Sequence, residues 1–521
     1  MRSANFTDGY DNIIVGGGAA GSVVAARLSE NADRRVLLLE AGPADSDPNI
    51  PAPHGVFPLL RGPLDWSYTT TPQPHLDGRE IPISGGRLLG GGGSINYQSW
   101  FRGHRLDYDT WSAHGMKGWS FDEVLPAFKR SEDHELGASH WHGTGGPIPV
   151  TTPRDLSPLS LAFIAAGVDQ GMSLNRDFTG AELDGVGLMY GNLRDGERVS
   201  AARGYLHPAA DRPNLEVRTG ALVRRVLTES GRAVGVEYTD DSGSPTTVHA
   251  DSVVLSAGGI RSAQLLMLSG IGPADHLSEH GIDVVADLPG VGSNLQDHLS
   301  AMVIWPVTHG TTWLDAYTQE NVTRYQRDRR GPLASVGQAA GFLRAGRDAP
   351  APDIQLLPML IDLSGSGRPG FTCLVTLLTP DSRGTVRLRS ADAASNPAVD
   401  MRYLESAKDR RTLIDGLRAT MALGESPIFR AVTGEPFLPG ATDDTALEQA
   451  VRASAISINH PAGTCRAGVD EASVVDPDLR VHGVIGLHVV DSSVMPTLPR
   501  GNIHAPSIMI GERGAQLIAG A

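Results

Sequence analysis

The chain is poor in cysteine: Cys373 and Cys465 are the only two among its 521 residues. Two thiols cannot form a four-cysteine zinc site, and they do not make the dense pattern of a disulfide-stabilised secreted domain. The first residues, MRSANFTDGYDN, also lack the charged and then apolar pattern of a signal peptide. These features lead us to expect a cytoplasmic protein.

Long apolar runs and an excess of basic residues are missing as well. No apolar run approaches the ~18 residues that read as a membrane-spanning helix, so we expect no membrane insertion. Lysine and arginine number 44 against 59 aspartates and glutamates, which gives a net charge of −15. Nucleic-acid binding calls for a basic surface, so this balance argues against it and favours small-molecule chemistry.

Glycine is abundant instead, and its most informative cluster lies within residues 11–42. Residues 13–15 and 36–39 have the apolar composition of buried strands, and a helix rich in small residues is predicted between them. Between the first strand and the helix, Gly16, Gly18 and Gly21 follow the G-x-G-x-x-G spacing. Glycine there lets a pyrophosphate approach the backbone, and the helix start offers free N–H groups to it. Glu40 ends the second strand, where a carboxylate can hold ribose hydroxyls. The pattern predicts dinucleotide binding.

The remaining chain predicts two kinds of sheet. Residues 215–255 alternate with period two in short strands, as in a small antiparallel sheet. Residues 300–455 mix apolar strands with the helical pattern of residues 409–426. The C-terminal segment has a strand, a turn and a helix in the style of the first unit, so we expect it to return to the nucleotide-binding domain.

Several glycine-rich and histidine-bearing blocks occur in order from end to end. Together they resemble the glucose–methanol–choline (GMC) oxidoreductases, an FAD-dependent family. The blocks are GGRLLGGGGSIN (85–96), VVLSAGGIRSAQLLMLSGIGP (253–273), LPGVGSNLQDH (288–298), TPDSRGTVRL (379–388), INHPAGTC (458–465) and VVDSSVMPTLPRGNIHAPSIMIGE (489–512).

The resemblance implies an α/β fold with two domains. One is a Rossmann-like FAD-binding domain, which we assign to residues 1–155, 205–300 and 456–521. The other is a discontinuous substrate domain of the α+β type, built on an antiparallel sheet, which we assign to residues 156–204 and 301–455.

The resemblance also implies that His460 and His504 are catalytic. Oxidation of an alcohol removes a hydroxyl proton and a hydride, and an imidazole with a pKa near 6.5 suits the proton. We expect His460 to be the base and His504 to hold the substrate oxygen, although the two roles could be reversed. The alternative is that either histidine is structural, since the chain has 17 of them.

The same comparison implies a set of FAD-binding residues. The position that carries a covalent flavin link in some relatives is Ile95, so we expect non-covalent FAD. Tyr97 either shapes the substrate pocket or packs beneath the flavin, and Trp66 and Trp305 either line an aromatic site or belong to the core. The expected cofactor-binding residues are Gly16, Gly18, Gly21, Glu40, Ala41, Leu89, Gly91, Gly92, Asn96, Tyr97, Gln98, Val223, Ala257, Asp491, Asn502 and Ala505.

No metal site is expected. His134, Glu135, His140 and His142 are ligand types, but their spacing matches no regular metal motif.

The expected reaction is oxidation of a primary alcohol, with an aromatic (benzylic) or furanic alcohol as the best candidate and O2 reduced to H2O2. One alternative is a dehydrogenase that passes electrons to a quinone or another acceptor and acts on choline or an aliphatic alcohol. Another is a hydroxynitrile lyase that keeps the flavin as scaffold. Choline is less favoured because no cage for its cation is evident. The oligomeric state is left open.

Overall fold

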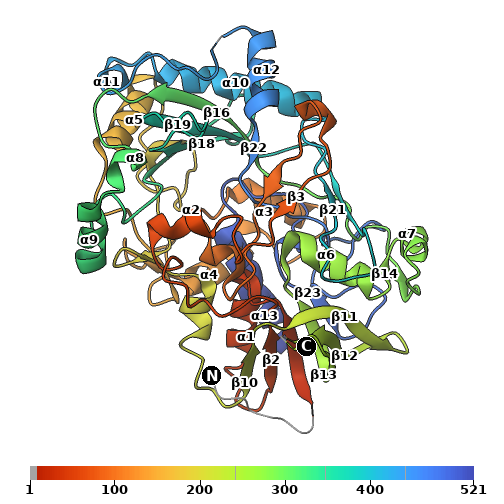
Figure 1. Ribbon diagram of the computed structural model, residues 1–521. Helices are drawn as coiled ribbons and strands as arrows, with labels where there is room; N and C mark the ends of the chain where they lie inside the picture. The colour runs from red at the N-terminus through yellow and green to blue at the C-terminus, as the bar shows by residue number, and fades with distance from the viewer. Residues whose placement is uncertain (1–8, 241, 347, 441, 521) are drawn as a thin grey trace.

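Two β-sheets, one largely parallel and one antiparallel, organise the protein (Figure 1). The computed structural model describes residues 9–240, 242–346, 348–440 and 442–520. The predicted α/β class with a Rossmann-like sheet and a separate antiparallel sheet is confirmed. Among the residues described, no helix has both the length and the apolar character needed to cross a membrane.

The larger sheet has seven strands in the order β10–β2–β1–β13–β12–β11, and β23 lies beside β13. Strands β10, β2, β1, β13 and β23 pair in parallel. The glycine fingerprint predicts strands β1 and β2, whereas the expectation of an antiparallel sheet over residues 215–255 is wrong for residues 215–218 and 250–255, which pair in parallel with β2 and β1. Strands β11 and β12 extend the sheet in antiparallel fashion. The bounds are β1 Tyr10–Val15, β2 Val36–Leu39, β10 Leu215–Arg218, β11 Leu222–Glu229, β12 Arg232–Thr239, β13 Pro245–Leu255 and β23 Leu487–Val489.

Strand β13 joins the two parts of this sheet. Residues 245–249 pair with β12, whereas residues 250–255 pair with β1. Burial changes at the same place, because Val253, Val254 and Leu255 are fully buried while the first half alternates with solvent. Parallel strands are covered on both faces, which explains the apolar end of this strand.

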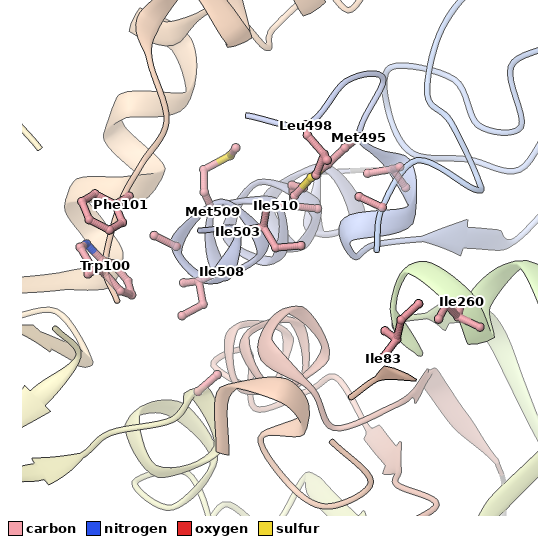
Figure 2. Close-up of a cluster of buried hydrophobic side chains, with 14 of the residues drawn as sticks. Ile83, Trp100, Phe101, Ile260, Met495, Leu498, Ile503, Ile508, Met509 and Ile510 are labelled. Atoms are coloured by element: carbon pink, nitrogen blue, oxygen red, sulfur yellow. The ribbon is translucent and has the colours of Figure 1, made fainter. Parts of the chain in front are cut away.

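Helices α1 (Ala19–Leu28) and α13 (His504–Ala519) pack together on the parallel strands. Their contact is close: a Cβ at Gly511 would lie 2.8 Å from the Ala20 carbonyl oxygen. Figure 2 shows Ile508, Met509 and Ile510 pointing to different sides of α13, and all three are fully buried. A helix that is apolar on every side is typical of a domain interior.

The second sheet has six antiparallel strands in the order β22–β16–β19–β18–β17–β7. Helix α10 (Ala407–Leu423) covers one face, where a Cβ at Gly416 would lie 2.9 Å from the side chain of Ile354. Gln355, the next residue, points to the other face and hydrogen-bonds Asn502. This second face therefore meets the segment that leads into α13. The bounds are β7 Gly185–Leu188, β16 Leu299–Pro306, β17 Ala339–Leu343, β18 Ile354–Met359, β19 Gly370–Leu377 and β22 Ile456–Ser457.

Further helices surround these sheets. Those of at least eight residues are α3 Arg105–Ala113, α4 Phe121–Ser131, α5 Pro158–Asp169, α6 Gly258–Leu268, α9 Gln319–Asp328 and α12 Asp444–Ser454. Helix α6 follows β13 directly and reaches the cavity described next.

Candidate functional site

A deep cavity lies at the carboxyl ends of the parallel strands. It contains about 1690 Å³ of space that no protein atom fills, part of it open to solvent. One end is formed by the turn after β1 and by the end of β2, and the other by His460 and His504. Ligands of open α/β sheets bind at this edge, so the fold and the cavity agree.

The glycines of the first turn are required by the space available. Gly16 has φ 102°, and a Cβ there would lie 2.5 Å from the Ser256 carbonyl oxygen. Gly18 caps α1 without any side-chain hydrogen bond, and the first turn of α1 has no acidic residue. The helix start is therefore open to an anion.

The cavity wall contains fourteen of the eighteen site residues expected from the sequence. They come from segments spread over nearly 500 positions of the chain, and the fold brings them together. These residues are Gly16, Gly18, Glu40, Ala41, Gly91, Gly92, Asn96, Tyr97, Val223, Ala257, His460, Asp491, Asn502 and His504.

The other four expected residues lie behind the wall. Gly21 allows α1 to approach the turn, since a Cβ there would lie 1.9 Å from the Gly16 carbonyl oxygen. Leu89 and Ala505 are buried. Gln98 is buried too and donates from Nε2 to the Asn96 carbonyl oxygen at 2.7 Å. None of the four is in the cavity lining.

Glu40 is a buried carboxylate at one end of the cavity. It accepts hydrogen bonds from the backbone N–H groups of Gly17 and Gly42, each at 2.8 Å. Burial raises the pKa of Glu40 to about 7, and these donors limit the rise. The arrangement fixes the position of this carboxylate in the cavity wall.

The structure shows which of two tryptophans lines the cavity and which belongs to the core. Trp66 lines the cavity, and the guanidinium of Arg261 lies 3.7 Å from its ring centre. Trp305 is fully buried and packs edge-on against Phe371 and Phe429, so it belongs to the core. Arg261 belongs to the block of residues 253–273, and nothing in its local sequence indicates a place in the wall.

His460 follows β22 in a loop and is held from three directions. Its backbone N–H donates to Asp297 Oδ1 at 2.7 Å. Its ring Nδ1 lies 2.9 Å from Nδ1 of His298, and its Nε2 lies 3.3 Å from Asn502 Nδ2. His298 and Asp297 belong to the LPGVGSNLQDH block, but the sequence did not assign them a role.

These contacts determine which nitrogen of His460 carries a proton. His298 Nε2 lies 3.1 Å from the Leu378 carbonyl oxygen, which only accepts, so this nitrogen bears hydrogen. Burial lowers the pKa of His298 to about 4, so the ring is neutral and its Nδ1 accepts. His460 must then donate from Nδ1, which leaves its Nε2 unprotonated. Because the Asn502 amide oxygen accepts from Gln355, Asn502 Nδ2 donates to this nitrogen at 3.3 Å. Burial lowers the pKa of His460 well below its ordinary value, so this neutral form prevails at pH 7.

Asp297 anchors the His460 loop. Besides the His460 N–H, it accepts from Tyr403 OH and Ser457 Oγ, each at 2.5 Å. Burial raises the pKa of Asp297 to about 6, and the three donors oppose the rise. Each of these hydrogen bonds therefore stabilises the ionised form of Asp297.

His504 opens α13 and is packed tightly beside Gly93. A Cβ at Gly93 would lie 2.5 Å from Cε1 of the ring. His504 Nε2 is buried and has no hydrogen-bond partner in the part of the chain that the structure describes. Burial, and after it the charge of Arg198, lowers the pKa of His504 to about 4, so the ring is neutral. Its Nε2 is enclosed by protein atoms, although the residue lines the cavity.

A separate cluster contains His134, His142 and Asp177, whose ligand atoms lie within 4.8 Å of one another. Hydrogen bonds already occupy them: His134 Nδ1 accepts from the Leu136 N–H at 3.2 Å, and His142 Nε2 lies 2.9 Å from Asp177 Oδ2. The buried guanidinium of Arg102 lies 3.4 Å from His142 Nδ1 and opposes a further cation. The cluster reads as a structural network.

Known proteins resemble the chain over its whole length. Family models described as GMC oxidoreductase match residues 10–300 and 380–511. An alcohol dehydrogenase [acceptor] of Pseudomonas putida is 39% identical, with 98% of this chain and 95% of that protein covered. An oxygen-dependent choline dehydrogenase of Brucella suis biovar 1 is also 39% identical, with the same shares covered.

Solved structures show the same fold. Pyridoxine 4-oxidase from Mesorbium loti superposes with a TM-score of 0.91 at 34% identity, covering 98% of this chain and 99% of that one. A fungal aryl-alcohol oxidase superposes with a TM-score of 0.87 at 26% identity, covering 99% of both chains.

Tyr403→Phe tests the anchor at Asp297. Because the folded pKa of Asp297 is raised, its ionisation disfavours folding as the pH rises through about 6. Removing the Tyr403 hydroxyl raises that pKa further, so the variant should lose about 1–2 kcal/mol at pH 8 and much less at pH 5. Thermal unfolding midpoints at both pH values measure this difference. Tyr317→Phe, at a side chain that is 58% exposed, is the control. An equal loss at both pH values would contradict the assignment.

Proposed function

Because the chain belongs to the FAD-dependent GMC oxidoreductase family, we propose that it oxidises a primary alcohol to the aldehyde. Electrons pass to O2 and give H2O2, and the best substrate candidate is an aromatic (benzylic) or furanic alcohol. The observation that carries the proposal is the unprotonated Nε2 of His460 in the wall of a cavity that begins at a dinucleotide-binding turn.

The residues present fit FAD. The open start of α1 and the turn at Gly16 and Gly18 would hold the pyrophosphate, and Glu40 the adenosine ribose. Val223 would meet the adenine, while Asn96, Tyr97, Asp491 and Asn502 would lie along the flavin side. When bound, FAD supplies the hydride acceptor that an alcohol oxidation requires.

His460 then acts as the general base for the substrate hydroxyl. Its Nε2 takes the proton, while Nδ1 stays hydrogen-bonded to His298, so the ring does not have to turn. Asn502 lies beside the same nitrogen, with its amide oxygen held by Gln355 Nε2 at 3.2 Å. His504, in the same wall, would hold the substrate oxygen. These groups align the hydroxyl and its carbon with the hydride acceptor.

The charge of the cavity wall favours a neutral substrate over choline. Glu40 and Asp491 are its carboxylates among the described lining residues. Glu40 is bound by backbone N–H groups, and Asp491 accepts from Gly258 N–H at 2.8 Å and Ser262 Oγ at 2.5 Å. Neither is free to pair with a quaternary ammonium group. The solved neighbours named for pyridoxine and aryl alcohols support an aromatic substrate.

A dehydrogenase using a quinone or another acceptor is the second candidate, favoured by the relative named alcohol dehydrogenase [acceptor]. A panel of benzylic, furanic, aliphatic and quaternary-ammonium alcohols, assayed for H2O2 and for dye reduction, separates the two. We expect turnover of benzylic or furanic alcohols with H2O2 formed in air. Dye reduction without H2O2 would establish the dehydrogenase. Cleavage of a cyanohydrin without flavin reduction would establish the hydroxynitrile lyase.

Non-covalent FAD is a further expectation, since Ile95 lines the cavity where a histidine would be needed for a covalent link. Acid precipitation of the yellow protein should leave free FAD in the supernatant, measured by its absorbance and by chromatography. A coloured pellet would contradict this.

Replacement of the two paired histidines tests the mechanism. His460→Ala should slow anaerobic flavin reduction by an alcohol by about 10²- to 10⁴-fold, because the base is lost. His298→Ala should slow it by ~10- to 100-fold, since the proton position on His460 is no longer fixed. His298→Gln, which offers an amide oxygen as acceptor, should recover part of that rate.

His309→Ala, at an exposed histidine, is the control and should leave the rate unchanged. Stopped-flow absorbance of the bound flavin gives all of these rates. An unchanged rate in His460→Ala would remove it as the base.

A further inference from the structure

Arg198 is a fully buried cation next to the cavity wall. It ends the short strand β9 (Glu197–Arg198), and none of its surface is exposed to solvent. Its guanidinium donates to three main-chain carbonyl oxygens: those of Ile50 at 2.6 Å, Ser94 at 2.5 Å and Asn96 at 2.9 Å. Its Nε atom, a further donor, has no partner among the described residues.

No carboxylate in the described part of the chain forms an ion pair with Arg198. Its neighbour Glu197 pairs with Arg203 and Arg329 instead. By contrast, Arg102 is equally buried and is paired with Glu132. A buried charge without a counter-ion costs several kcal/mol, and a neutral donor would bind carbonyl oxygens at a lower cost. The charge itself therefore calls for an explanation.

The charge lies behind the segment that forms the histidine end of the cavity. Ile95 and Asn96 line the cavity on one side of this segment, and Arg198 holds the carbonyl groups of Ser94 and Asn96 on the other. The same charge reaches His504, whose pKa it lowers. Burial lowers the pKa of Arg198 only to about 9, so it stays protonated at neutral pH.

We propose that Arg198 is a positioning residue whose fixed positive charge stabilises negative charge in the cavity, on the substrate oxygen and on the bound flavin. An oriented cation in a site of low dielectric constant needs no rearrangement when charge develops. Arg198 also polarises the carbonyl groups of Ser94 and Asn96, which belong to the segment that places Asn96 and Tyr97 in the cavity wall. This inference rests on the proposed function, because the negative charge arises when an alcohol loses its proton and its hydride.

Sulfite provides a test that does not depend on the alcohol substrate. This anion adds reversibly to oxidised flavins and bleaches their absorbance, so titration of the flavin-loaded enzyme at pH 7 gives a dissociation constant. Arg198→Gln keeps a donor but removes the charge, and it should weaken sulfite binding by about 10-fold or more. Arg198→Lys keeps the charge and should stay within about 3-fold of the parent protein.

Arg203→Gln is the matched control, because Arg203 lies nearby but is paired with Glu197, and its sulfite affinity should be unchanged. If Arg198→Gln does not retain flavin, Arg198→Met serves as the second charge-removing variant. Sulfite binding as tight in the charge-removing variant as in the parent overturns the proposal. So does equal loss in Arg198→Lys, which would show a purely structural role. Anaerobic reduction of the parent by benzyl alcohol tests the proposed function separately.

Discussion

The hydrogen bond between Nδ1 of His298 and Nδ1 of His460 is the contact on which the chemistry of the site depends. Two neutral imidazoles form such a bond only if one donates and the other accepts, and the Leu378 carbonyl decides which. The consequence reaches the cavity wall, where His460 Nε2 carries no hydrogen and accepts from Asn502. Asp297, held by Tyr403 and Ser457, fixes the loop that carries this ring. The orientation of the His460 ring and the position of its hydrogen are thus set by the surrounding structure.

Burial governs the electrostatics of the whole cavity. It raises the pKa of Glu40 and Asp297, and it lowers the pKa of His460 and His504. In every case the cause is the loss of water around the charged form. Neutral imidazoles and the buried carboxylate of Glu40 therefore lie in the wall of the same cavity. Arg198 adds positive charge from behind the wall without exposing it to solvent.

The fold could be predicted well where interactions between residues close in sequence determine the structure. The strand, the glycine turn and the helix at residues 10–28 follow from packing and backbone geometry within a few residues. The resemblance to a family indicated most of the cavity wall, including both histidines. It did not assign roles to His298 or Asp297, although their motif was noted, because a hydrogen-bond partner behind a base leaves no local pattern. Arg198 and the contact of Arg261 with Trp66 were likewise hidden.

The sequence by itself determined the dinucleotide turn, the strand and helix pattern, the acidic balance and the identity of the family. These properties depend on residue type and short spacing. The tertiary structure alone decided which nitrogen of His460 carries hydrogen, because His298 lies 162 positions away along the chain. It also decided that Arg198 has no ion-pair partner among the described residues, and that Gln355 of the antiparallel sheet orients Asn502. Protonation and charge pairing depend on distances between segments, and only the folded chain sets those distances.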